Sequence, residues 1–291
     1  MKNTFDKLVI VGVGLIGGSA ALALRKAGNA GHIVGVGRSR ASLNRAVRLG
    51  VIDEASADLK HALAGADVVL LAAPVGQNAA LMRAMAPYLE AGTVVTDCGS
   101  TKQDVIAHAR RYLSAHLANF VPGHPIAGSE QTGVDAARAD LFAGKTVVLT
   151  PLPQTSKKAL SRAGALWRVC GARLRRMDPE THDRVLAAVS HLPHVLAFAL
   201  VNNIALRRDA RLLFSFAAGG FRDFTRIAGS SPEMWKDVCI ANRKVLLAEL
   251  DGYQRSLKEI RAAVRNSDAA ALQKLFDNAR RARATWLAGK Y

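Results

Sequence analysis

The sequence predicts an α/β protein whose N-terminal part is a doubly wound parallel sheet and whose C-terminal part is all-helical. Three observations lead to this prediction. Short β-branched runs alternate with helical stretches from Lys7 to about Thr150, and a glycine motif follows the first of these runs. Strand-like runs then stop near residue 178, while helical periods continue to the end of the chain. We therefore expect two domains, residues 1–178 and residues 179–291.

The strand-like runs of the first domain are continuously apolar, which is typical of a parallel sheet covered on both faces. In chain order they are LVIVG from residue 8, HIVGVG from 32, DVVLLAAP from 67, TVVTDCG from 93, NFVPG from 119 and TVVLTP from 146. Residues 19–27 and 41–49 carry alanine, leucine and arginine at helical periods. A further helix within residues 151–172 and a short strand in RLRRMD, from residue 173, complete this domain.

The second domain is expected to begin with a helix of more than 25 residues. Asp178 is suited to cap this helix, Pro179 fits its first position, and Glu180 is placed favourably near the positive end of the helix dipole. Its later residues are apolar nearly all round, which predicts burial on several sides. Because such a helix is too apolar to face water, we expect it to form a subunit interface. Two closing helices are expected within residues 246–291.

Composition indicates a soluble, globular, cytoplasmic protein. Half of the residues are apolar and the mean hydropathy is +0.10. The three cysteines are far apart and form no CxxC pair, so we expect reduced thiols. No secretory signal is recognised, and no apolar run reaches the roughly 18 to 20 residues that a membrane helix needs. We therefore expect no membrane partner.

The net charge of +17 is the one strongly biased property of the chain. Such a charge is compatible with nucleic-acid binding or with an acidic small substrate. The basic residues are, however, dispersed along the chain, without interleaved aromatic residues and without a recognisable nucleic-acid module. We interpret them as a solvated surface and expect no nucleic-acid partner.

The glycine motif is GVGLIGG, which begins at Gly12 and carries Leu15 and Ile16 between its second and third glycines. Gly12, Gly14 and Gly17 have the GxGxxG spacing of a dinucleotide site, and the motif leaves a strand and opens a helix, as that site requires. The first glycine permits a tight turn, the second permits close approach of a pyrophosphate, and the third permits close packing of the helix. The sequence therefore predicts a Rossmann-type dinucleotide-binding domain.

The end of the second strand-like run indicates which dinucleotide is bound. An NAD site presents an acidic residue there, whereas this chain has Gly37 followed by Arg38, Ser39 and Arg40. Two guanidinium groups and a hydroxyl suit the 2′-phosphate of NADP, so we expect NADP, with NAD as a possible alternative. Ala73 and Pro74, which end a later run, are expected to lie along the cofactor.

Three polar side chains follow the next two strand-like runs. Ser100 and Thr101 come after TVVTDCG, and His124 comes after NFVPG. Carboxyl ends of parallel strands share one edge of a sheet, so we expect all three residues near the cofactor. A neutral imidazole can accept the proton of a substrate hydroxyl while hydride leaves the same carbon, which makes His124 a candidate general base.

Three motifs, in this order, resemble those of the prephenate and arogenate (cyclohexadienyl) dehydrogenases of tyrosine biosynthesis. They are GHPIAGSE from residue 123, SHLPH from residue 190 and GGFRDFTRIAGSSPEMW from residue 219. The resemblance implies NAD(P)-dependent oxidative decarboxylation to 4-hydroxyphenylpyruvate or tyrosine. It also implies a homodimer that pairs through an all-helical dimerisation domain. It also implies that His124 accepts the hydroxyl proton, that Ser100 hydrogen-bonds the same region, that Glu130 lies at the mouth of the pocket, and that His194 and Arg226 contact the substrate.

The chemistry of a substrate with two carboxylates fits Arg226, which can bind one of them in bidentate geometry, with Asp223 holding the loop. A structural ion pair of Arg226 is the alternative. His191 and His194 are three residues apart, but without a third ligand we expect no metal site. Pro193 between them predicts a kink that directs His194 towards the cofactor. His191 is then a packing partner, and Trp235 is assigned to the core.

Two other functions are compatible with parts of this sequence. Other two-domain β-hydroxyacid dehydrogenases and imine reductases share this plan, but they place a lysine on the long helix, and this chain has none between Pro179 and Ala205. A non-catalytic dinucleotide-sensing or nucleic-acid-binding protein is supported by the charge alone. The sequence does not decide between prephenate and arogenate as the substrate.

Overall fold

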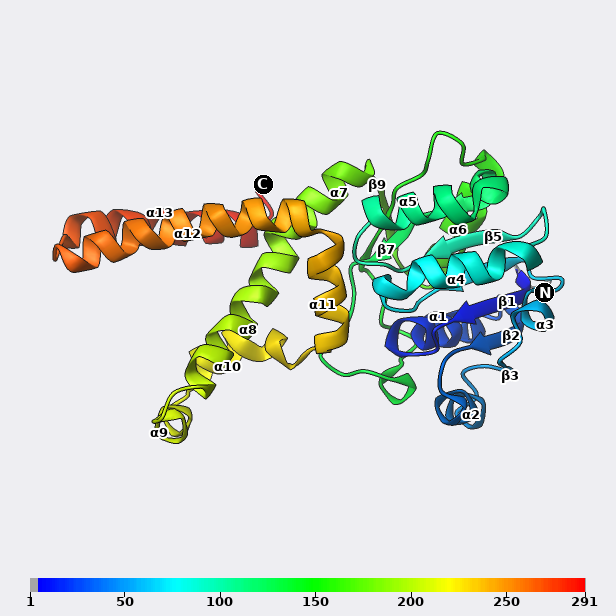
Figure 1. Cartoon of the computed structure of the whole chain (residues 1–291), viewed down its shortest axis with the longest axis horizontal. Coiled ribbons are helices and arrows are strands. Elements are labelled where there is room, and N and C mark those ends of the chain that lie inside the picture. The colour runs from blue at the N-terminus through cyan, green and yellow to red at the C-terminus, as the bar shows by residue number, and fades with distance from the viewer. Residues whose placement is uncertain (1–4, 291) are drawn as a thin grey trace. The chain divides into compact units, whose positions relative to one another are not determined.

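The computed structural model describes residues 5–290, and the chain divides into two compact units, residues 1–243 and 244–291 (Figure 1). The first unit contains both sheets and the helices up to α11. The second contains α12 (Arg243–Arg265), apart from its first residue, and α13 (Ala269–Leu287). The predicted domain boundary at residues 178 and 179 coincides with the change to all-helical structure rather than with this division, and it stays a prediction.

The first sheet has six parallel strands in the order β3-β2-β1-β4-β5-β6, which confirms the predicted doubly wound sheet. The strands are β1 (Phe5–Val11), β2 (Ala30–Val36), β3 (Glu54–Ser56), β4 (Val68–Leu71), β5 (Val94–Asp97) and β6 (Phe120–Val121). The strand order reverses between β1 and β4, so the loops that follow these two strands diverge and leave room for a ligand at the carboxyl edge.

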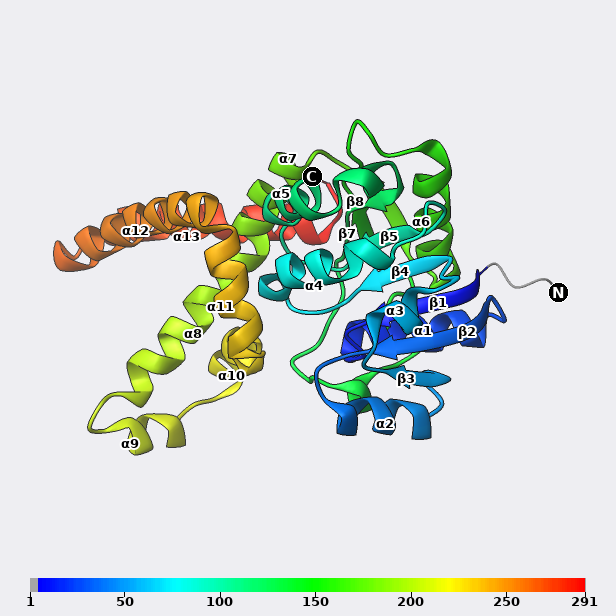
Figure 2. The same ribbon diagram turned by 45° about the vertical axis from the view of Figure 1, so that its right-hand side comes forward.

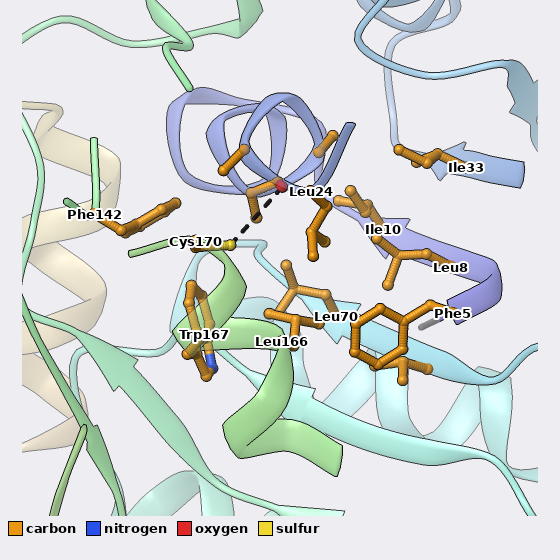
Figure 3. Packing of buried hydrophobic residues seen from close by; sticks show 14 of the residues in the cluster. Phe5, Leu8, Ile10, Leu24, Ile33, Leu70, Phe142, Leu166, Trp167 and Cys170 are labelled. Atoms are coloured by element: carbon orange, nitrogen blue, oxygen red, sulfur yellow. Dashed lines mark hydrogen bonds between the residues drawn. The ribbon is translucent and has the colours of Figure 1, made fainter. Parts of the chain in front are cut away.

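Helices cover both faces of this sheet because its strands are apolar on both sides. They are α1 (Leu15–Lys26), α2 (Arg40–Arg48), α3 (Leu59–Leu63), α4 (Asn78–Met85), α5 (Gln103–Tyr112) and α6 (Lys157–Val169), with single turns η1 (Val75–Gln77), η2 (Ala86–Tyr88), η3 (Ser114–Asn119) and η4 (Val134–Ala136). Leu8 and Ile10 face a core built with α1 and α6, around Trp167 (Figure 3). Val9 and Val11 alternate to the other face, against α3, α4 and α5.

A second, three-stranded sheet in the order β7-β8-β9 corrects one prediction. TVVLTP was expected in the parallel sheet, but β8 (Thr146–Leu149) pairs antiparallel with β7 (Gly123–Pro125) and parallel with β9 (Arg173–Arg176). The cause lies at Pro122, which has no N–H to continue the ladder of β6. The chain therefore leaves the first sheet at this residue, and His124 lies inside a short strand of the second sheet rather than in a loop.

Among the described residues, every element after β9 is helical, as predicted. These elements are α7 (Pro179–Leu186), the π-helical η5 (Ala187–His191), α8 (Leu192–Ala205), α9 (Ala210–Ser215), α10 (Gly219–Thr225), η6 (Arg226–Gly229), α11 (Pro232–Ala241), α12 and α13. In both views α9 lies at the end of α8 remote from the sheets (Figure 2). The Asp178 carboxylate caps α7 by accepting the Thr181 N–H, and Pro179 occupies the first helical position, as expected.

The long helix is continuous from α7 through η5 to α8, but it is not buried as predicted. Among the described residues, Pro179–Ala205 is the one helical segment with the length and apolarity of a membrane span, with a mean hydropathy of 1.6, and only 22% of its most apolar window is buried. Leu200 and Leu206 are exposed at its far end. The expected burial on several sides is therefore wrong for the single chain.

Candidate active site

The loop between β1 and α1 has two positions that only glycine can occupy. Gly12 has a φ of 99°, and a Cβ there would lie 2.7 Å from the backbone nitrogen of Ala73. A Cβ on Gly17 would lie 2.3 Å from the carbonyl oxygen of Gly12. The first position requires a left-handed conformation, and the second holds α1 directly against the strand end.

Gly14, in contrast, is open. No atom lies within 4 Å of a Cβ built on Gly14, and α1 begins after it with neither a side-chain cap nor an acidic residue in its first turn. The N–H groups that begin a helix have no partner within the helix, and here they belong to Leu15, Ile16 and Gly17. Open space in front of an uncapped helix start fits the pyrophosphate of a dinucleotide.

The end of β2 carries the expected positive charge. Arg38 and Arg40 line a pocket of about 140 Å³ between the ends of β2 and β3. The Ser39 hydroxyl is engaged in capping α2, where it accepts the Ser42 N–H at 3.2 Å. The Arg38 guanidinium also donates to the Glu233 carboxylate in α11 at 3.3 Å, in an exposed ion pair that is worth little in water.

The end of β4 lies against both the glycine loop and α11. Ala73 and Pro74 are half-buried, and the backbone of Ala73 is what a Cβ on Gly12 would meet. The next residue, Val75, packs with Trp235 and Val238 of α11. Helical and sheet residues thus meet at the predicted carboxyl edge.

The two hydroxyl residues predicted at the end of β5 differ in burial. Ser100 is half-buried, whereas Thr101 is completely buried, so the hydroxyl of Thr101 is not offered to a ligand in this structure. The adjacent Lys102 is also completely buried, and its ammonium group donates to the Asp97 carboxylate and to the carbonyl oxygen of Gly123. The Asp97 carboxylate in turn accepts the Gly123 N–H at 3.0 Å.

This ion pair fixes the residue immediately before His124, because both backbone groups of Gly123 are held. The His124 ring is 8% exposed, and its Nδ1 lies 2.8 Å from Nε2 of His182. Burial, together with the nearby His182, Lys102 and His191, lowers the pKa of His124 well below the ordinary histidine value. His124 is therefore a neutral imidazole, as a general base must be.

Two residues of α7, His182 and Asp183, complete this group and were missed by the sequence reasoning. His182 Nδ1 lies 2.8 Å from the Asp183 carboxylate, and that carboxylate also accepts the backbone N–H groups of Lys102 and Gln103. Burial alone would raise the pKa of Asp183, but the hydrogen bonds from His182, Gln103 and Lys102 bring it below the usual value. Burial lowers the pKa of His182, and the hydrogen bond to Asp183 opposes this only in part.

A signal for His182 and Asp183 was present in the sequence. They follow the Asp178 cap by four and five residues, and they precede Leu186 at helical spacing, so they share the buried face of α7. Adjacent titratable residues on a buried helix face are uncommon unless they are paired.

His194 and His191 both contact the ring of Trp235. The His194 ring stacks on the indole of Trp235 at 3.7 Å between ring centroids, and its Nδ1 lies 2.8 Å from the carbonyl oxygen of Ser190. His191 is 1% exposed, and its Nδ1 lies 3.2 Å from the amide nitrogen of Asn242. Trp235, 8% exposed, thus belongs to the core, as predicted, and also supports His194.

The helix departs from regular α geometry just before Pro193, in the π-helical turn η5, which ends at His191. The kink expected at Pro193 stays a prediction. Burial lowers the pKa of His191 to about 4. Burial also lowers the pKa of His194, and the positive charge of Arg226 adds to this effect. His194 and Arg226 are therefore close enough to interact.

Glu130 and Arg226 are brought together, although 96 residues separate them in the sequence. The Arg226 guanidinium donates to the Glu130 carboxylate at 3.2 Å, and the two side chains are 61% and 44% exposed. The expected help from Asp223 is replaced by Glu130, which is the hydrogen-bond partner that the structure gives Arg226. The pair is exposed and contributes only about 0 to 1 kcal/mol, so Arg226 can exchange Glu130 for a ligand carboxylate at small cost.

The predicted residues thus fall into three groups. The glycine loop and the end of β2 form a dinucleotide site, His124 and Ser100 lie near the end of β5, and His194, Arg226 and Glu130 lie beyond them. Residues 5–290 contain no group of three or more His, Cys, Asp or Glu side chains placed to hold one metal ion. The arrangement is suited to bind a nicotinamide dinucleotide and to accept a proton from a substrate hydroxyl.

Two models of one protein family match most of the chain. The family model described as prephenate dehydrogenase, nucleotide-binding domain, matches residues 20–176, and that described as prephenate dehydrogenase, dimerization domain, matches residues 178–278. The prephenate dehydrogenase of Bacillus subtilis is 38% identical over 96% of this chain and 76% of its own length.

Two solved structures are similar over nearly the whole chain. The prephenate dehydrogenase from Aquifex aeolicus, in complex with hydroxyphenyl propionate and NAD+, has a TM-score of 0.87 and 36% identity, over 96% of this chain and 98% of the other. The arogenate dehydrogenase of Synechocystis has a TM-score of 0.78 and 30% identity, over 96% and 99% of the two chains.

Proposed function

The chain belongs to the prephenate dehydrogenase family, and from this premise we propose that it oxidises its cyclohexadiene substrate with His124 as general base and NADP as the preferred cofactor. The reaction class, oxidative decarboxylation in tyrosine biosynthesis, follows from the family. When bound, the nicotinamide accepts a hydride from the ring carbon that carries the hydroxyl. The assignment of residues and the cofactor preference are our own inferences.

One observation carries the proposal. His124 is a neutral, almost buried imidazole whose Nδ1 is engaged by His182, while its Nε2 makes no hydrogen bond with any described residue and is not sealed from solvent. A base of this kind is ready to accept a hydroxyl proton. It follows Gly123, which the Asp97 and Lys102 side chains tie to the end of β5.

The proton on His124 is held only transiently. Loss of hydride and of the hydroxyl proton leaves a ring ketone, and departure of the ring carboxylate as CO2 then sends two electrons into the ring and makes it an aromatic phenolate. Because the product is a phenol, the proton returns from His124 to the ring oxygen. Aromatisation drives decarboxylation, so no metal is required for that step.

Positive and polar groups account for the rest of the substrate. A substrate with two carboxylates suits Arg226, which forms only a weak exposed pair with Glu130 in this structure. His194, held by Trp235 and Ser190, is positioned for a second polar contact. Ser100, half-buried at the end of β5, is assigned to hydrogen-bond the reacting hydroxyl.

The preference for NADP rests on charge at the end of β2. Arg38 and Arg40 line the pocket beside Gly37, where an NAD site would carry an acidic residue. A 2′-phosphate placed there would gain charge-assisted hydrogen bonds and would meet no carboxylate on β2. Replacement of Arg38 and Arg40 by alanine should raise the KM for NADP far more than that for NAD, whereas Arg48→Ala, on the same helix, should change neither.

We also propose that the protein acts as a homodimer in the cytoplasm, with residues 179–291 as the dimerisation domain. The exposed apolar surface of α8 supports a second copy as its cover, because an isolated chain would leave this surface in water. Sedimentation of the purified protein tests this proposal directly. A monomer at micromolar concentration would contradict it.

The deciding experiment measures reduced-nicotinamide absorbance with prephenate and with arogenate, each in the presence of NADP or NAD. We expect turnover of at least one substrate and a larger kcat/KM with NADP. His124→Asn should reduce kcat by roughly 100- to 10,000-fold with little change in cofactor affinity. Failure of the wild-type protein to reduce either cofactor would contradict the proposed function.

A further inference from the structure

Three side chains from two elements form a continuous hydrogen-bonded row inside the first unit: Asp183 and His182 of α7, and His124 of β7. We propose that His182 and Asp183 are positioning residues that fix the proton of His124 on Nδ1 and so keep its Nε2 bare for the substrate hydroxyl. This inference rests on the proposed role of His124 as general base.

The row begins at a firmly anchored carboxylate. Asp183 is 2% exposed and accepts the backbone N–H groups of Lys102 at 2.8 Å and Gln103 at 2.9 Å, at the start of α5. These donors, together with the positive end of the α5 dipole, favour the ionised carboxylate. An ionised carboxylate has no proton to donate, so the hydrogen bond with His182 Nδ1 has one possible direction.

That direction sets the tautomer of His182. Its Nδ1–H donates to Asp183, and a neutral ring then has a bare Nε2, which must accept. Protonation of both nitrogens is opposed by burial and by the positive charge of Lys102, which lowers the pKa of His182. The His182 ring is completely buried, so it has no water to turn towards.

The tautomer of His124 follows from that of His182. Because Nε2 of His182 accepts, Nδ1 of His124 must carry the proton that is donated across the 2.8 Å contact. A neutral His124 then has its lone pair on Nε2, the nitrogen that has no hydrogen-bond partner among residues 5–290. Without these two residues, both tautomers of a neutral imidazole would be populated, and the one with its proton on Nε2 cannot accept the substrate proton at that nitrogen.

The same row supports the base during the reaction. When the hydroxyl proton arrives on Nε2, the His124 ring becomes positive, and its Nδ1–H remains bonded to a histidine that is itself bonded to a carboxylate. The positive charge of Lys102 acts in the opposite sense, because it disfavours the imidazolium. The charged state is therefore short-lived, and the proton is returned to the ring oxygen of the product.

The first test needs no mutation and no turnover. Nuclear magnetic resonance of the NADP-bound protein with isotope-labelled histidine distinguishes the two neutral tautomers through their ring nitrogens, and His124→Asn identifies the signals of His124. We expect His124 with its proton on Nδ1 and His182 also with its proton on Nδ1. A His124 ring with its proton on Nε2 would overturn the proposal, even if the enzyme is fully active on prephenate.

The second test compares two substitutions at one position. His182→Gln keeps an acceptor oxygen in reach of His124 Nδ1, whereas His182→Leu removes it. We expect kcat to fall by roughly 100- to 10,000-fold in His182→Leu, with the KM for substrate nearly unchanged, and to recover by at least tenfold in His182→Gln. The control is Arg184→Ala, an exposed neighbour on α7, which should leave kcat unchanged.

Folding of each variant is checked by its thermal unfolding and by its affinity for NADP. Equal kcat values for folded His182→Leu and the wild type would overturn the proposal, as would equal losses in the leucine and glutamine variants. If His182→Leu does not fold, the tautomer measurement on the wild type decides the question by itself.

Discussion

The substitution Lys102→Met isolates the energetics of the buried ion pair beside His124. Lys102 and Asp97 are both completely buried, and the ammonium group has two partners, the Asp97 carboxylate and the carbonyl oxygen of Gly123. Methionine fills a similar volume without the charge. It leaves the Asp97 carboxylate with only the N–H groups of Gly99 and Gly123 as donors.

The expected cost follows from this geometry. Removing one partner of a buried pair leaves an uncompensated charge and costs roughly 3 to 5 kcal/mol in the free energy of unfolding. The double variant Asp97→Asn with Lys102→Met leaves no buried charge, although one amide donor loses its partner at a cost of roughly 1 to 3 kcal/mol. The double variant should therefore be more stable than Lys102→Met alone.

The pH dependence of stability separates this explanation from a packing defect. In Lys102→Met, burial without a counter-charge should raise the pKa of Asp97 in the folded state above its unfolded value. The folded state then binds more protons than the unfolded state, so stability falls as pH rises through the range between the two pKa values. The double variant lacks this carboxylate and should not show the effect.

Urea unfolding, followed by circular dichroism between pH 5 and pH 8, is the assay. The kcat measured in parallel should also fall in Lys102→Met, because the backbone of Gly123 loses its donor and His124 shifts. If the free energy of unfolding of Lys102→Met at pH 8 lies within about 1 kcal/mol of the wild-type value, the loss of Lys102 does not leave an uncompensated buried charge on Asp97. A double variant less stable than the single one would refute the reasoning equally.

Three further predictions concern the glycine loop and the histidines. Gly17→Ala places a Cβ 2.3 Å from a backbone oxygen and should lower the free energy of unfolding in urea by roughly 1 to 3 kcal/mol. A Cβ at Gly14 meets no atom within 4 Å, so Gly14→Ala should fold nearly normally. Its affinity for NADP, measured by fluorescence titration, should fall about tenfold. Because the pKa of His124 is depressed, kcat/KM should hold its plateau below pH 6.5 and fall only at more acidic pH; a decline centred at 6.5 or above would contradict the role of burial. The pKa of His191 is lowered to about 4, so as pH falls from 6.5 the unfolded state binds a proton before the folded state does. The free energy of unfolding should therefore fall by up to about 3 kcal/mol by pH 4. His191→Asn should show a smaller fall over the same pH range.

The local features of this protein could be predicted from its sequence alone. Gly12, Gly14 and Gly17 follow a strand and open a helix, and the structure places them as that pattern requires. The capped start of α7 and the absence of strands after β9 were equally readable, because caps and hydrophobic periods act between residues close together in the chain. The three motifs that contain His124, His194 and Arg226 identified the family for the same reason.

The pairing of polar groups that are distant in the chain depends on the three-dimensional fold. The chain leaves the first sheet at Pro122, so His124 lies in the second sheet, where its ring contacts His182. Lys102 looks like a surface residue in the sequence, yet it is completely buried on Asp97. A buried charge is stable only where a partner and hydrogen bonds compensate its loss of water, and those partners come from segments whose proximity no local pattern records.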